Sequence, residues 1–488
     1  MTEAVPDPSR GRGARVGVNS GLVAGGKAAG AAISLGALAV AAKALSVEEM
    51  GSLLVLHALV LFCSEALTFK TSLLVVRYGT EPAMAGDAGA LARVLRFCTT
   101  LDVASSAVAF LLTLLAGLAL RVVLPALAAL PIPLLLLYLT LVLLRQISAS
   151  LGTLRLLGRF GTLGAHALIQ PSVRLLGGFA ALLLGWGLTG FVAVYFAASA
   201  ISHLSLIGLA VWRLAGAGLG RAIPRSLSFE APAPGAWRFS VLTNAEGTLS
   251  TLVTDAPVVL AGLVLGGGEA AVFKVAQDAA SLLTGGVKVV DRAMFPELAR
   301  LAAAGGRREL IRLTRRVSLV LGLVGLAMAG LVLLIGPVPL TAIFHKPEYG
   351  QAATPLAILF LAAALSGVGT PFLPAFYANG RPGQALLARG AEAGGFLVLV
   401  WPLSVLFGVV GTAGAILAGA AGFAGLAVTL ALRQSWSEGE DHAANNVSRA
   451  ASATSPTEAD RSGGPGQPAS VLSAPAKARG PSKRGNAW

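Results

Sequence analysis

The chain is poor in charged residues and in cysteine. Only 12% of its 488 residues are Asp, Glu, Lys or Arg, whereas soluble domains carry about 25%. The acidic residues are the scarcer, at 23 against 37 Lys and Arg. The two cysteines, Cys63 and Cys98, provide neither a disulfide framework nor the ligand spacing of a metal site. This composition excludes an ordinary soluble domain, and we expect no metal and no cofactor.

Long apolar blocks fill most of the chain, and 55% of its residues are hydrophobic. A membrane-spanning helix needs about 20 such residues. The sequence therefore predicts an all-α polytopic membrane protein of about twelve transmembrane helices. The expected spans cover roughly 18–43, 51–69, 92–118, 123–146, 162–186, 189–212, 238–264, 270–295, 317–343, 352–376, 385–408 and 410–433.

The distribution of positive charge predicts the orientation of these spans. Most of the 37 Lys and Arg residues fall on one side when the N-terminus is placed in the cytoplasm, including Arg145 and Arg155 in one loop. This matches the excess of Lys and Arg in cytoplasmic loops, so the basic balance does not indicate nucleic-acid binding. An even number of spans places both termini in the cytoplasm.

Two similar turn sequences indicate that the chain consists of two related halves. Residues 45–54, "LSVEEMGSLL", and 265–274, "LGGGEAAVFK", are each a short acidic turn between two spans, six helices apart. This spacing fits a parallel repeat of two halves about the membrane normal. The expected domains are a disordered N-terminus (1–16), an N-lobe (17–213), an inter-lobe linker (214–237), a C-lobe (238–434) and a disordered cytoplasmic tail (435–488).

The eighth expected span carries charge within the membrane. At 100° per residue its polar side chains fall within a sector of about 120°; they include Lys274, Gln277, Asp278, Ser281 and Lys288. A charge at the bilayer centre costs about 2.5–3.5 kcal/mol on insertion scales. This stripe therefore predicts a helix face turned toward a hydrated lumen. The alternative is that Lys274 and Asp278 form a structural i,i+4 pair and that Lys288 snorkels to the cytoplasm.

Other spans present polar faces too. His166, Gln170 and Arg174 are spaced i, i+4, i+8 and so share one side of the fifth span. We expect Lys27, Arg174, Lys274 and Lys288 to form a cationic lumen that binds substrate. Further polar lumen residues are His166, Gln170, Asn244, Gln277 and Ser281, and the candidate carriers of a coupling ion are Glu65, Asp102, Asp255 and Asp278.

Two functional classes are disfavoured. "GLVAGGKA" (21–28) matches the start of a phosphate-binding loop, but it lacks the following Ser or Thr and the preceding strand that such a loop needs. The loops between spans leave no room for a soluble catalytic domain. We therefore expect neither an ATP-driven pump nor an enzyme.

Several motifs resemble those of a known family. They are "EAAVFKVAQDAASLL" and "RAMFPELARLAAAGGRRELIRLTRR" around the eighth span, "LSVEEMGSLLVLHAL" (45–59) and "ANGRPG" (378–383). Over about residues 17–434 the chain resembles the lipid-linked oligosaccharide flippases of the multidrug/oligosaccharidyl-lipid/polysaccharide exporter superfamily.

The resemblance implies a bacterial inner-membrane transporter with two six-helix lobes around a central cavity, which works by alternating access. Its cargo would be an undecaprenyl-diphosphate-linked oligosaccharide, destined for polysaccharides such as lipopolysaccharide. H⁺ or Na⁺ would be the coupling ion, and membrane lipids and a polymerase or co-export protein would be partners. The alternatives are a cation-coupled multidrug exporter of the same superfamily, a glycan polymerase or ligase, and a non-transporting scaffold.

Overall fold

The structure is a computed structural model. It describes the chain apart from residues 1–11, 146, 282–306, 374–375, 377–381 and 454–488. Every regular element of this described part is helical, which confirms the all-α class. Two compact units are present, residues 1–432 and 433–488. Eight described helices are long and apolar enough to cross a membrane, and the bent pair α12–α13 makes a ninth.

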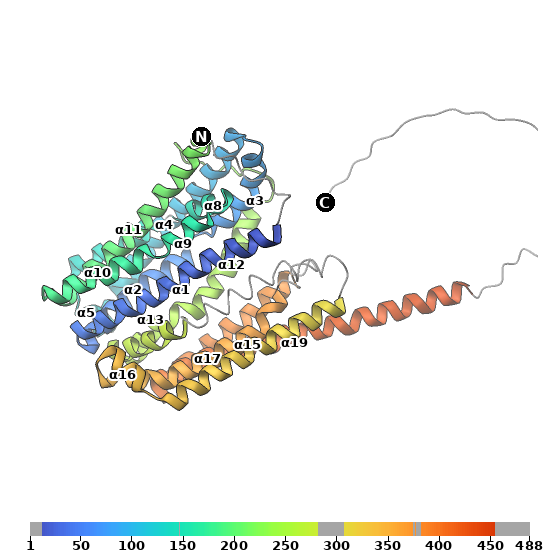
Figure 1. The fold of residues 1–488 in the computed structure, drawn as a ribbon. Helices are drawn as coiled ribbons and strands as arrows, with labels where there is room; N and C mark the ends of the chain where they lie inside the picture. The colour runs from blue at the N-terminus through green and yellow to red at the C-terminus, as the bar shows by residue number, and fades with distance from the viewer. Residues whose placement is uncertain (1–11, 146, 282–306, 374–375, 377–381, 454–488) are drawn as a thin grey trace, which may run out of the picture. The chain divides into compact units, whose positions relative to one another are not determined.

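The first half contains four long helices. They are α1 (Arg12–Ala44), α2 (Val47–Leu67), α4 (Ala88–Val123) and α11 (Gly187–Gly216). Helix α2 is central, because residues 51–60 are all buried and α1, α4, α11, α12 and α13 all contact it. Helix α10 (Ile169–Leu183) lies beside α1 and α11 (Figure 1).

Two expected spans are interrupted rather than continuous. The span expected over 123–146 consists of α5 (Pro125–Ala128), α6 (Ile132–Leu139) and α7 (Leu141–Leu144). Pro125, Pro131 and Pro133 explain the breaks before α5 and α6, since proline lacks the N–H that a continuous helix uses. The span expected over 162–186 divides into α9 (Phe160–His166) and α10.

Two short helices lie where the sequence predicts loops. Helix α3 (Thr71–Met84) packs against α8 (Ser148–Leu156), and the Ser72 amide donates to Ser148 Oγ at 3.0 Å. A Cβ on Gly152 would approach the backbone of Ser72 to 2.8 Å, so the two helices touch closely. Helix α3, at 14 residues, is too short to be a candidate span, whereas α8 forms the last part of the candidate span Ile132–Leu156.

The second half begins along α2. Helix α12 (Ala236–Thr254) and helix α13 (Ala256–Leu265) meet at a 42° bend and both contact α2. A helix over 267–281 follows. Beyond it come α15 (Arg307–Ile335), α16 (Val338–Phe344), the 3-10 turn η2 (Pro347–Ala352), α17 (Ala353–Gly369) and the 3-10 turn η3 (Thr370–Phe372).

The last helix, α19 (Pro382–Ala453), contains a reversal at Gly408. Gly408 has φ 60° and ψ −140°, which is accessible to glycine and strained for other residues. The two arms fold back on each other, because a Cβ on Gly395 would lie 3.3 Å from Gly419 Cα. They correspond to the spans expected over 385–408 and 410–433. Helix α19 continues to Ala453, into the segment 435–488 for which the sequence predicts disorder; Ala-rich sequence supports such an extension.

Candidate functional site

The two turns with similar sequences meet at one end of the molecule. Gly51 of α2 lies against Gly267, and a Cβ on Gly51 would overlap the Gly267 carbonyl. Lys346 Nζ also donates to the Leu45 carbonyl at the end of α1. The first and second halves are therefore in backbone contact at this end, which we call the α1–α2 end.

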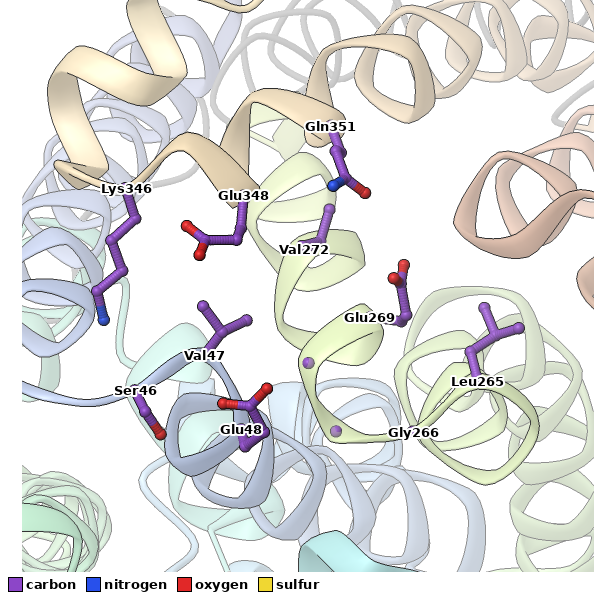
Figure 2. A pocket seen from close by; sticks show the side chains of 12 residues that line it. Ser46, Val47, Glu48, Leu265, Gly266, Glu269, Val272, Lys346, Glu348 and Gln351 are labelled. Atoms are coloured by element: carbon purple, nitrogen blue, oxygen red, sulfur yellow. The ribbon is translucent and has the colours of Figure 1, made fainter.

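An acidic pocket of about 640 Å³ lies at the α1–α2 end. Figure 2 shows that its carboxylates come from three segments: Glu48 at the start of α2, Glu269 after the 266–268 glycines, and Glu348 in η2. Lys346 also lines it. The neighbouring Glu49 is engaged differently, because it accepts from the Ser46 amide in a capping box that starts α2.

A second cavity, of about 580 Å³, lies in the first half and is basic. Its cationic lining residues are Lys27 from the N-terminal part of α1, Arg145 after α7, and Arg155 on α8. Among the described lining residues none is acidic. The other polar lining residues are His166, Gln170, Ser202 and His203. We call this the basic cavity; its volume falls within the range of small-ligand sites.

Arg145 is fixed in the wall of the basic cavity by a carboxylate from α2. Glu65 forms ion pairs with Arg145 and with Lys70. Burial lowers the pKa of Lys70, and the charge of Asp255 opposes that effect. Because Lys70 also lies against Gly247 of α12, this cluster joins the two halves of the chain. The Arg145 side chain is 14% exposed, and its pairing with Glu65 orients it without removing it from the cavity.

The polar face expected on the fifth span is present, although the helix is broken there. His166 and Gln170 both line the basic cavity. His166 Nε2 is 2.9 Å from the Ser202 carbonyl, and Gln170 Nε2 donates to Ser199 Oγ at 3.0 Å. Both partners lie on α11. Hydrogen bonds between α11 and this face therefore shape the cavity wall.

Arg174, the third residue of that face, is turned toward the buried core. Its Nη2 lies 2.8 Å from His57 Nε2, and its guanidinium lies 4.4 Å from the centre of the Tyr195 ring. His57 Nδ1 is 2.7 Å from Tyr138 Oη. Arginine can only donate, so His57 Nε2 accepts and His57 Nδ1 donates to Tyr138. Arg174 thus links α10 to α2 and α6 through hydrogen bonds and to α11 through its contact with the Tyr195 ring.

Lys274 forms the ion pair that the sequence left open as an alternative. Its Nζ lies 2.8 Å from Asp278 Oδ1 and 3.3 Å from Gln277 Oε1. Gln277 Nε2 in turn donates to the Thr254 carbonyl at 2.8 Å, where α12 ends. The stripe on helix 267–281 thus fills the break between α12 and α13. Lys288 lies outside the described residues.

The other expected site residues lie apart from the basic cavity. Asp255 sits at the bend between α12 and α13 and accepts from Thr254 Oγ1 at 3.1 Å. Asn244 Oδ1 is buried and has no partner among the described residues. Ser281 donates to the Asp278 carbonyl at 2.7 Å. Among the residues expected to form a cationic lumen, Lys27 lines the basic cavity. Arg174 is instead hydrogen-bonded to His57, and Lys274 is paired with Asp278.

Asp102 is buried in a structural position. It is 3% exposed, and it accepts from Thr71 Oγ1 at 2.6 Å and from the Ala149 amide at 2.8 Å. We expect Asp102→Ala to lower the free energy of unfolding by about 2–5 kcal/mol, since it leaves two buried donors unpaired. Thermal unfolding of the purified protein measures this. Asp278→Ala, at a partly exposed ion pair, serves as the control; equal stability of both variants would contradict the assignment.

Four polar residues of the basic cavity were not expected there: Arg145, Arg155, Ser202 and His203. The excess of positive charge in cytoplasmic loops already explained both arginines, so nothing in the sequence pattern placed Arg145 and Arg155 in a site. His203 follows Ser199 and Ser202 on α11, and this small polar stripe was the available signal.

The fold is that of a known class of membrane transporters. A MATE transporter of the MOP superfamily in an inward-facing conformation superposes with a TM-score of 0.60 at 14% identity, over 83% of this chain and 94% of the other. A mutant of the Vibrio cholerae MATE transporter VcmN gives 0.59 at 15% identity, over 86% and 97%. The neighbours thus define the architecture as that of the MATE transporters, and the twelve expected helices in two lobes are consistent with it.

A third neighbour is a MOP superfamily transporter from Pyrococcus furiosus, with a TM-score of 0.56 at 14% identity over 88% of this chain and 96% of the other. It is described by a reverse polarity of its binding pocket that suggests a different function. In sequence, the chain is 27% identical over 342 residues to the inner membrane protein YghQ of Escherichia coli, covering 68% of this chain and 93% of YghQ. No family model matches. These likenesses support a multi-pass inner-membrane protein.

Proposed function

We propose that the protein is a flippase that moves undecaprenyl-diphosphate-linked oligosaccharides across the bacterial inner membrane by alternating access. The observation that carries this proposal is the basic cavity, in which Lys27, Arg145 and Arg155 gather and no described lining residue is acidic. A diphosphate is an anion and its sugars are hydrophilic. Fixed cations with hydrogen-bonding neighbours in a small cavity suit such a headgroup.

The polarity of the cavity selects between candidate cargoes. A cationic amphiphile entering the basic cavity would meet three residues of the same charge. Repulsion between like charges disfavours binding of such a ligand. An anionic headgroup would gain charge-assisted hydrogen bonds from the same residues. A MOP superfamily neighbour is itself described by a pocket of reverse polarity and a different function, which supports polarity as a discriminating feature in this fold.

The contact at the α1–α2 end supports alternating access. Two similar turns, one from each half, meet there through Gly51 and Gly267. In our orientation, with both termini cytoplasmic, this is the outer end, and the basic cavity lies toward the cytoplasm. We propose that the outer end opens to release cargo, that H⁺ or Na⁺ supplies the energy, and that a polymerase or co-export protein receives the product.

The second candidate function is cation-coupled multidrug export. The acidic pocket favours it, because Glu48, Glu269 and Glu348 would attract a cationic drug. That pocket lies at the α1–α2 end, however, whereas the polar cavity within the first half is basic. We therefore retain drug export as the alternative.

Reconstituted vesicles separate the two functions. The full chain would be incorporated with a fluorescent undecaprenyl-diphosphate oligosaccharide, and the label in the outer leaflet would be bleached by an impermeant reductant. We expect faster loss of the protected label than in protein-free vesicles, and no accumulation of a cationic dye under an imposed ion gradient. Dye transport without lipid movement would overturn the proposal in favour of drug export.

A further inference from the structure

One ring nitrogen of His166 is hydrogen-bonded, and the other has no hydrogen-bond partner among the described residues. Its Nε2 lies 2.9 Å from the Ser202 carbonyl. A carbonyl oxygen only accepts, so Nε2 carries the hydrogen. In the neutral ring the lone pair then resides on Nδ1, which has no partner among the described residues. Because His166 lines the basic cavity, a proton added at Nδ1 would place a second N–H donor in its wall.

The groups that face His166 are almost all basic. Helix α1 contributes Lys27, α8 contributes Arg155, the segment after α7 contributes Arg145, and α11 contributes His203. Arg174, on the next helix, is engaged with His57. Arg145 is paired with Glu65 of α2. A proton on His166 would stand beside these cationic lining residues, and a bound anion would supply a charge opposite to it.

His203 is less suited than His166 to bind a second proton. His203 Nδ1 is buried and lacks a hydrogen-bond partner among the described residues. A proton there would be an unpaired buried donor, which is costly. His203 is therefore best suited to remain neutral, with its hydrogen on Nε2. Of the two cavity histidines, His166 alone has its second nitrogen placed to bind a proton beside a ligand.

We propose that His166 is the proton-binding group of the basic cavity and that it takes up a proton from solvent at Nδ1 when a phosphate-class anion binds. This rests on the proposed function only in that the cargo headgroup is an anion. By linkage, a ligand that binds together with a proton binds more tightly as pH falls. The four carboxylates considered from the sequence do not line the basic cavity. Asp102 accepts from Thr71 and Ala149, Asp255 accepts from Thr254, and Glu65 and Asp278 are in ion pairs.

Calorimetry of the purified full chain tests the inference. The probe is a short-chain isoprenyl diphosphate monosaccharide, a diphosphate diester whose own phosphates do not titrate near neutral pH. Titrations between pH 6 and 8 in two buffers of different ionisation heat give the protons taken up per ligand. We expect wild type to take up as much as about one proton and its affinity to rise by up to about tenfold per pH unit on acidification.

Two variants make the result specific. His166→Gln keeps a donor for the Ser202 carbonyl and cannot be protonated, so we expect it to bind the probe with no proton uptake and no pH dependence. His345→Asn is the control, because His345 is exposed at the α1–α2 end with φ 58°, a conformation that asparagine tolerates; it should behave as wild type. Undiminished uptake in His166→Gln overturns this inference and leaves the proposed function standing. Absence of probe binding by wild type at every pH overturns both.

Discussion

Arg145→Gln is expected to lower the affinity for a lipid-linked diphosphate by about 10- to 100-fold, with a matching loss of flipping. This range corresponds to about 1.5–3 kcal/mol, the contribution of a hydrogen bond to a charged group. Arg145 is paired with Glu65, a carboxylate of the central helix α2, so its charge is held in place before cargo arrives. Glu65 would keep Lys70 as its partner, which limits structural damage.

The measurement is the calorimetric affinity for the isoprenyl diphosphate monosaccharide, together with lipid movement in vesicles. Arg145→Lys preserves the charge but loses the planar fork of the guanidinium, so we expect intermediate affinity. The control is Arg221→Gln, the same change at an exposed residue of the 3-10 turn η1 (Gly220–Ala222). Equal affinities for Arg145→Gln and Arg221→Gln would show that Arg145 does not contact the cargo.

Gly51→Ala is expected to separate the two halves of the chain at the α1–α2 end. The added Cβ would overlap the backbone of Gly267, and backbone atoms cannot turn aside as a side chain can. Overpacking of this kind costs about 1–3 kcal/mol, so we expect about a tenfold fall in the population that is closed at this end. Flipping should fall with it, because a protein held open at one end cannot complete the cycle.

Cysteines at Val47 and Gly268 report this contact, since a Cβ on Gly268 would lie 3.5 Å from Val47 Cγ1. The native Cys63 and Cys98 are buried and give little background. Gly425→Ala is the matched control: a Cβ there meets nothing within 4 Å, and Gly→Ala in a compatible helix is mildly stabilising. If the Val47/Gly268 cysteine pair cross-links as fast in Gly51→Ala as in Gly425→Ala, the Gly51–Gly267 contact does not close the α1–α2 end.

The sequence predicted the architecture well because membrane helices are defined by long apolar runs. It could not predict where proline would divide the span over 123–146, since neighbouring helices often accommodate proline within a membrane. It also missed α3 and α8, whose contact depends on Gly152 fitting against Ser72. Such a fit is a property of two distant segments and leaves no periodic signal.

The candidate site was predictable only where helical spacing places residues on one face. The spacing of His166 and Gln170 put both on one face, and both line the basic cavity. Arg174 shares that spacing, but the buried His57 and Tyr195 draw it away. Arg145 and Arg155 stand near span ends, where positive charge is expected in any membrane protein. Their convergence with Lys27 depends on tertiary packing alone.

The most direct test of the account is the charge preference of the basic cavity. The full chain in lipid nanodiscs would be titrated with the isoprenyl diphosphate monosaccharide, with its uncharged isoprenyl glycoside and with a cationic dye, each at low and high salt. We expect the diphosphate to bind at least about tenfold more tightly than either and to lose affinity as salt screens the cations. Tighter binding of the dye than of the diphosphate would contradict the account.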